Sequence, residues 1–140
     1  MARGGQNGGG KAARSVGEQI LASLPSGVLA VDAEGKILTI NPAAREFLRL
    51  GPGAGDPGKP LAGFPAAKPF AEVFDEIRRG GEAILRRSVI LEYDERNRRE
   101  IGLSASLLEG PAPFNGVIFL FTDMTERRQL ERAAHLNRQL

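Results

Sequence analysis

The chain has 140 residues, of which 41% are hydrophobic, 26% charged and 6% aromatic. These values are typical of one soluble globular domain with short terminal extensions. There is no run of 18 apolar residues and no apolar N-terminal segment, so neither a transmembrane helix nor a secretory signal is expected. Cysteine is absent and histidine occurs once, which excludes disulfides, thiolate nucleophiles and a cysteine metal site, and one histidine alone cannot supply a zinc site. We predict no metal site. We expect a cytoplasmic protein.

The basic character of the chain is concentrated at its N-terminus. Arg3, Lys11 and Arg14 lie in the first fourteen residues, which contain no acid. The remaining 16 basic residues face 17 acidic ones, so residues 15–140 carry a net charge of −1. A protein that binds a nucleic-acid groove carries a basic stripe on its folded surface. We therefore predict no nucleic-acid partner, and no membrane contact by this segment.

The first two segments are a tail and a helix. Residues 1–14 are rich in glycine, which predicts a disordered tail. Residues 15–25 are predicted to form a flanking helix, because Val16, Ile20 and Leu24 recur at i, i+4 and i+8. This helix is amphipathic and needs an apolar surface to cover its apolar face.

A hairpin and a short helix follow. Val28–Val31 reads as a strand, Asp32–Gly35 as a turn with glycine at its end, and Lys36–Ile40 as the return strand. Asn41 is a favourable N-cap and Pro42 suits the first helical position, so a helix is predicted to begin there.

The segment from Gly51 to Pro69 holds five prolines and five glycines, so it cannot be one long helix. A helix is predicted from Pro69 to Arg79, ended by Gly80 and Gly81. Its apolar residues share one face.

Three strands are predicted after this helix, at 82–93, 100–107 and 117–121, with a charged hairpin connection at 94–99. The strand 100–107 alternates as a half-buried strand does. The strand 117–121 is apolar on both faces, which predicts a central strand covered on both sides. A last helix is predicted from Thr125. The element order indicates an α+β fold with a mostly antiparallel five-stranded sheet.

Three stretches together resemble the PAS sensor family. Leu24–Asp32 followed by Gly35–Ile37 resembles its opening hairpin, Asn41–Ala44 the start of its first core helix, and Phe121–Arg127 the Asp-x-Thr signature that closes the domain. The resemblance covers about residues 20–128. It implies a PAS core at 26–125, with short helices on one face of the sheet, between the flanking helix and a C-terminal connector helix at 126–140.

The closing signature has a physical interpretation of its own. Asp123 and Thr125 lie where the last strand becomes the final helix, and such residues accept the free N–H groups of a first helical turn. Caps at this point fix the angle between sheet and helix, so a change in the sheet can move the helix. Helix capping without signalling needs the same residues, and both interpretations stay open.

The final helix is predicted to be coiled-coil-like. Leu130, Ala133, Asn137 and Leu140 are spaced as a and d positions of a heptad, although an amphipathic helix lying on the sheet has a similar pattern. We predict a homodimer formed through this helix or, alternatively, through the flanking helix 15–25.

The resemblance also implies a pocket between sheet and helices that can hold haem, flavin or a metabolite. The candidates for its lining are Asn41, Phe47, Phe64, Phe70, Phe74, Ile77, Leu103 and Leu120. A packed core is the favoured interpretation of the apolar ones, because a domain this small needs them buried. No cofactor is expected: the helix 69–79 lacks a histidine for haem, and there is no cysteine for a flavin adduct. Arg45, Arg49 and Lys68 could serve an anionic ligand, but a solvated face is the favoured interpretation.

No nucleophile–base set or carboxylate pair stands out, so catalysis is not expected. The resemblance implies a sensory domain of a multi-domain bacterial signalling protein, which dimerises and relays a signal through its C-terminal helix to an output module in the same chain, such as a histidine kinase. The alternatives are a receptor for a small molecule, and the PAS domain of a transcription regulator or of a cyclic-dinucleotide enzyme.

Overall fold

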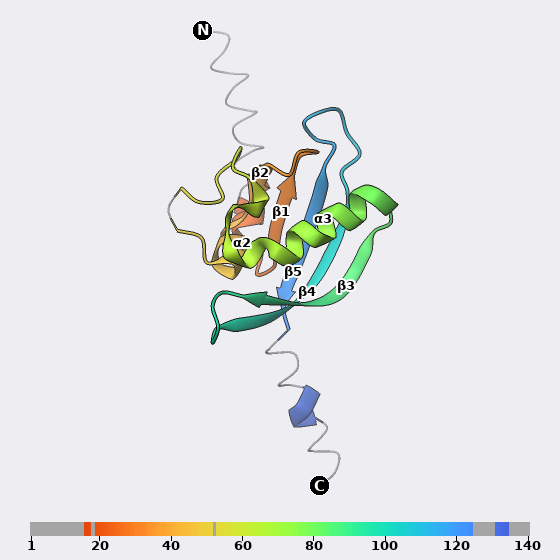
Figure 1. Ribbon diagram of the computed structural model, residues 1–140. Helices are drawn as coiled ribbons and strands as arrows, with labels where there is room; N and C mark the ends of the chain where they lie inside the picture. Colours follow the sequence, from red (N-terminus) through yellow and green to blue (C-terminus); the bar gives the residue numbers. More distant parts are fainter. Residues whose placement is uncertain (1–15, 18, 52, 125–130, 135–140) are drawn as a thin grey trace.

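The computed structural model describes residues 16–17, 19–51, 53–124 and 131–134. Its centre is a five-stranded antiparallel sheet of order β2-β1-β5-β4-β3, and helices α2 and α3 lie across one face (Figure 1). The predicted α+β class and PAS-like architecture are confirmed. The elements are β1 Gly27–Val31, β2 Ile37–Ile40, α2 Pro42–Leu48, the 3-10 turns η1 Leu61–Gly63 and η2 Pro65–Ala67, α3 Lys68–Gly80, β3 Ile84–Glu92, β4 Arg98–Leu107 and β5 Val117–Asp123.

The predicted hairpin and its turn are confirmed in β1 and β2. The Asp32 carboxylate accepts hydrogen bonds from the backbone N–H groups of Glu34 and Lys36, both at 2.9 Å. Gly35 takes a left-handed conformation with φ 81°, which glycine adopts without strain. A local side-chain contact and one glycine therefore fix the reversal of the chain.

The sheet buries one set of alternating side chains beneath the helices. On β4, Ile101 and Leu103 are fully buried, as the alternating pattern predicted. On β5, Val117, Phe119 and Phe121 are buried but Leu120 is 48% exposed. The prediction that β5 is covered on both faces is therefore wrong. The strand is central in the sheet, yet part of its outer face is open in the described structure.

Helix α3 closes the core. It runs one residue beyond each predicted end, and Gly81 ends it in a left-handed conformation with its N–H bonded to the Ile77 carbonyl. The Phe70 ring meets the rings of Phe119 and Phe121 edge-to-face, with centroids 5.3 and 5.0 Å apart. Such aromatic pairs add attraction to the burial of their surface. The core is thus built from one face of α3 and the inner face of β5.

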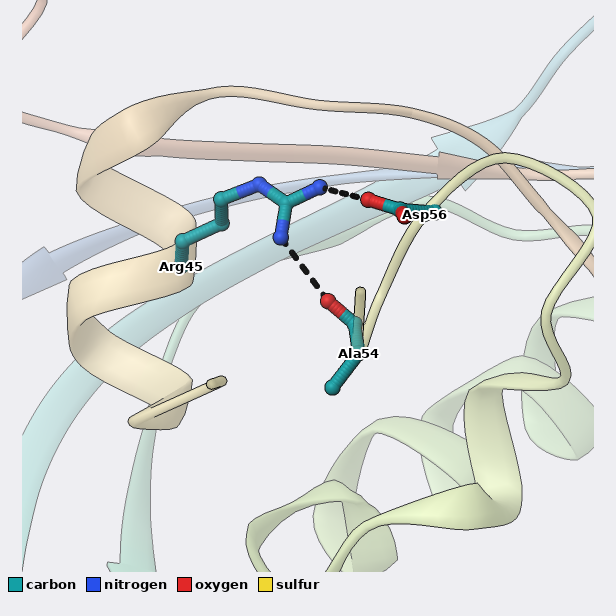
Figure 2. Close-up of polar contacts among 3 residues, drawn as sticks. All are labelled: Arg45, Ala54 and Asp56. Carbon is teal, nitrogen blue, oxygen red and sulfur yellow. Dashed lines mark hydrogen bonds and ion pairs between the residues drawn. The ribbon is translucent and has the colours of Figure 1, made fainter. Parts of the chain in front are cut away.

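The segment between α2 and α3 is held by side chains from its neighbours. The Arg45 guanidinium of α2 pairs with the Asp56 carboxylate at 2.6 Å and donates to the Ala54 carbonyl at 2.8 Å (Figure 2). Leu61 is buried and anchors η1 in the core. Backbone hydrogen bonds join the same segment to β2, from Ile37 N–H to the Lys59 carbonyl at 2.9 Å and from Gly58 N–H to the Ile37 carbonyl at 2.8 Å.

The flanking segments are described in part. Residues 16–17 and 19–23 are helical, and Val16 and Ile20 are 57% and 55% exposed. Residues 131–134 are helical as well. The predicted tail at 1–14 and most of the predicted connector helix lie outside the described residues. Among the residues that are described, no helix has the length and apolarity to cross a bilayer.

Candidate functional site

The site of interest lies where the central strand leaves the sheet. Asp123 is the last residue of β5, and its carboxylate lies 3.5 Å from the Arg99 Nε at the start of β4. The Arg99 guanidinium also lies 5.0 Å from the centroid of the Phe47 ring in α2. A cation over an aromatic face is attracted by the electrons of the ring. Arg99 therefore links the exit of the sheet to the first core helix.

Phe47 connects this link to the core. Its ring meets the Phe121 ring edge-to-face at 5.3 Å, and its backbone carbonyl accepts a hydrogen bond from the Tyr93 hydroxyl. The Arg49 guanidinium lies over the Tyr93 ring, 3.9 Å from its centroid. The β3–β4 hairpin, α2 and the end of β5 thus meet in one cluster of alternating aromatic and basic side chains.

The electrostatics of the cluster appear at Tyr93. Burial raises the pKa of its phenol above the ordinary value, because the phenolate is disfavoured away from water. The positive charges of Arg99 and Arg49 act against this rise, and the carboxylates of Asp123 and Glu46 add to it. Tyr93 is therefore held as the neutral donor that its hydrogen bond to α2 requires.

A cleft of about 420 Å³ opens beside this cluster. Ala22 and Leu24 line it, and they belong to the entry segment, residues 19–26, which leads into β1. Phe47 of α2 and the pair Arg99 and Asp123 line it as well. The segment that enters the domain and the strand that leaves it therefore converge on the same side of α2.

Asn41 does not line a pocket, in contrast to its prediction. It is 3% exposed, and its Oδ1 accepts from the N–H groups of Val28 and Ala44, both at 2.9 Å. Its Nδ2 donates to the carbonyls of Leu21 and Ser26, at 3.1 and 2.9 Å. A side-chain amide has two donor hydrogens and one oxygen with two lone pairs. All four positions are in use, so nothing is left for a ligand.

The other pocket candidates divide into three groups. Phe47, Phe70, Ile77 and Leu103 belong to the buried core cluster. Phe64 and Phe74 are half-buried and pack against its edge. Leu120 points to the opposite face of the sheet, so its assignment to the pocket is corrected: neighbouring residues of a strand face opposite sides.

The described residues offer little for chemistry of their own. No group of three or more histidines, cysteines or carboxylates is placed to hold a metal ion within the described part of the chain. Arg45 is half-buried and paired with Asp56, in contrast to the solvated position expected for it. Arg49 is exposed, as expected, and lies over the Tyr93 ring. Lys68 is exposed at the start of α3, as expected. The arrangement is suited to mechanical coupling between elements.

The predicted relay and dimer residues are only partly visible. Asp123 lies at the predicted junction and Ala133 is an exposed helical residue. Leu24 is half-buried and directly follows the helical residues 19–23, which we call the entry helix. The remaining predictions lie outside the described residues: Thr125, Leu130, Asn137 and Leu140.

Arg99 is the residue of this cluster that the sequence analysis did not single out. It falls in the predicted charged hairpin connection 94–99, but its side chain is only 27% exposed and pairs with Asp123. A partial signal lies in the sequence, because Arg99 directly precedes the predicted strand 100–107 and Asp123 follows the predicted strand 117–121 by two residues. The register that pairs Ile101 with Asp123 brings the two side chains close, and sequence alone does not fix that register.

Comparisons with known proteins agree with this architecture. A model of the PAS fold family matches residues 17–124. A search of curated proteins found no match. Similar solved structures include the PAS domain of BvgS from Bordetella pertussis, with 21% identity and a TM-score of 0.60, over 89% of this chain and 97% of that one. A PAS domain from Colwellia psychrerythraea has 9% identity and a TM-score of 0.60, over 81% and 98%.

The phage VqmA–DPO complex is similar as well, with 18% identity and a TM-score of 0.64 over 96% of this chain. The chain spans 63% of the length of that protein. At these identities the neighbours show the fold, and the family model carries the assignment. The chain therefore belongs to the PAS fold family, whose members are sensory and regulatory domains.

Proposed function

We propose that this PAS domain belongs to a multi-domain bacterial signalling protein, forms a homodimer, and relays a signal through its C-terminal helix to an output module such as a histidine kinase. The observation that carries the proposal is the position of Asp123. It ends the central strand, and Arg99 ties it to Phe47 of the first core helix. A rearrangement of the core that moves Phe47 would move Arg99, and with it the point where the chain leaves the sheet.

The energetics of the link suit a switch. The Arg99–Asp123 pair is partly exposed, with side chains 27% and 37% accessible. Ion pairs of this kind contribute about 0–1 kcal/mol to stability. Breaking the pair therefore leaves the fold intact while releasing the Asp123 side chain at the end of β5, as a reversible relay requires.

The test is carried out in the longer protein that contains this domain. We expect Arg99→Gln and Asp123→Asn to change the activity of the output module, or its response to stimulus, while the domain stays folded. Arg98→Gln is the matched control, because Arg98 lies on the same strand and is exposed. If the activity of the output module and its response to stimulus are unchanged in both Arg99→Gln and Asp123→Asn, the proposed relay is wrong.

The dimer is proposed to form through the flanking helix or the connector helix. Val16 and Ile20 are more than half exposed, and on the outer face of the sheet Ile90 and Leu120 are 49% and 48% exposed. Exposed large apolar side chains of this kind are candidates for contact with a second copy of the chain. Analytical ultracentrifugation of Ile20→Glu and of the chain without residues 126–140 tests the two routes. Dimer affinity unchanged in both variants contradicts the proposed interfaces.

A second candidate function is a receptor for a small molecule. The fold is shared with a VqmA that was crystallised with DPO. The core side chains that would line a pocket in this chain pack against one another, which favours the relay. Native mass spectrometry of freshly purified protein distinguishes the two, since a receptor retains a bound compound. The visible absorption spectrum of the purified protein tests the prediction that it binds neither haem nor flavin.

A further inference from the structure

We propose that the Asn41 side chain couples the entry helix to α2, so that a movement of this helix reaches Asp123 through α2. This gives the domain an input on its N-terminal side that needs no ligand in the core. The inference rests on the proposed relay at Asp123 for its output end, and it adds the entry end.

The first step is the hold on the entry helix. The described helical residues end at Ser23, and the Leu21 carbonyl belongs to the last turn, whose carbonyls lack partners within a helix. The Asn41 Nδ2 donates to this carbonyl at 3.1 Å and to the Ser26 carbonyl at 2.9 Å. One amide group therefore binds both the last turn of the entry helix and the turn that leads from it into β1.

The second step is the hold on α2. The Asn41 Oδ1 accepts from the Ala44 N–H as the N-cap of α2, and from the Val28 N–H of β1. Because Asn41 is 3% exposed, water does not replace any of these bonds easily. The entry helix therefore cannot withdraw without breaking the bond between the Leu21 carbonyl and the side chain that also caps α2.

The third step leads from α2 to the exit. Helix α2 has seven residues, and Phe47 lies near its far end, with its ring beside Arg99. Arg99 holds Asp123, and the Met124 N–H that follows donates to the Glu100 carbonyl at 3.0 Å. The cleft lined by Ala22 and Leu24 as well as by Arg99 and Asp123 places both ends of the route on one side of α2.

The experiment uses the full 140-residue chain, whose lack of cysteine allows a single spin label at Gln19→Cys, an exposed helical position. In Asn41→Ser the hydroxyl can still cap α2, but it cannot reach both carbonyls. We expect the label to become more mobile and the Met124 amide to exchange with solvent about tenfold faster through local opening. Ile77→Val is the control, because it weakens the core at a position away from the hydrogen bonds of Asn41.

A second variant keeps the test decisive if Asn41→Ser does not fold. Gln19→Pro breaks the exposed entry helix and leaves Asn41 in place. We expect faster exchange of the Met124 amide here also. A label that stays immobile in Asn41→Ser overturns the hold on the helix, and Met124 exchange equal to that of the control overturns the coupling. These readouts do not involve output activity. The proposed function can therefore fail in its own assay while the coupling through Asn41 is upheld.

Discussion

The two sides of the helical layer are built from different chemistry. Beneath α3 the core is apolar and closely packed, with Phe70, Phe119 and Ile77 buried to 1% exposure or less. Around α2 the contacts alternate between aromatic rings and polar groups, from Asn41 through Phe47 to Arg99. The first region holds the domain together. The second contacts the segments through which the chain enters and leaves, and it is the region in which we propose the coupling.

The largest effect is expected in the apolar region. Phe119→Ala removes a fully buried ring from the centre of β5 and leaves a cavity against Phe70. We expect the free energy of unfolding to fall by about 3–5 kcal/mol, measured by urea denaturation. Phe114 is 57% exposed, so Phe114→Ala is the control, with a change within about 0.5 kcal/mol. Equal losses in the two variants contradict the assigned core.

Gly27→Ala is expected to disturb both regions at once. A Cβ at this position would lie 2.3 Å from the Phe121 ring, which itself packs on Phe47 and Phe70. The ring must shift, at a cost of about 1–3 kcal/mol by overpacking. Gly80→Ala in α3 meets nothing within 4 Å and should stabilise the helix by about 0.5–1 kcal/mol. Thermal unfolding of the pair measures the contrast, and a stable Gly27→Ala would refute the close approach.

Tyr93 gives the polar region a pH dependence. Its pKa is raised by burial in the folded state, so the neutral phenol contributes stability below the unfolded-state pKa of about 10. This stability is lost as the pH rises through the folded-state pKa. We expect Tyr93→Phe to cost about 1 kcal/mol at neutral pH and to abolish the extra loss above about pH 10.

The measurement for Tyr93 is direct, because it is the only tyrosine and the chain has no tryptophan. Titration of phenolate absorbance should give a midpoint above that of free tyrosine. A midpoint at or below the ordinary value shows that the phenol is not buried against Phe47.

The smallest effect on stability is expected for Arg99→Gln, which should lower the free energy of unfolding by no more than about 1 kcal/mol. The ion pair is partly exposed, so its role is positional. Chemical denaturation beside Arg98→Gln measures the change. A loss as large as that of Phe119→Ala would place Arg99 with the core residues, and the contrast between the two regions would fail.

Local signals in the sequence predicted much of the fold. The Asp32–Gly35 turn and the cap at Asn41 depend on neighbouring residues, so composition and spacing suffice to find them. The exposure of Leu120 was not predicted, because an apolar residue on a central strand gives no indication of whether anything covers the outer face. Burial of that kind depends on tertiary contacts.

The site was less predictable for the same reason. Asp123 was identified through its family signature, but its partner Arg99 depends on the register of β4 and β5. The Asn41 amide was seen as a cap, and its second pair of bonds to Leu21 and Ser26 needs the path of the entry segment in space. Sequence thus reveals contacts within one turn, and the coupling contacts span separate elements.

The central claim is that Arg99 and Asp123 act as one link at the exit of the sheet. The most direct measurement is hydrogen exchange of the Met124 amide, which is bonded to the Glu100 carbonyl beside the pair. Arg99→Gln and Asp123→Asn should each accelerate this exchange, and the double variant should exchange no faster than either one, because both remove the same interaction. Accelerations that simply add, or an amide that does not respond to either change, would contradict the link.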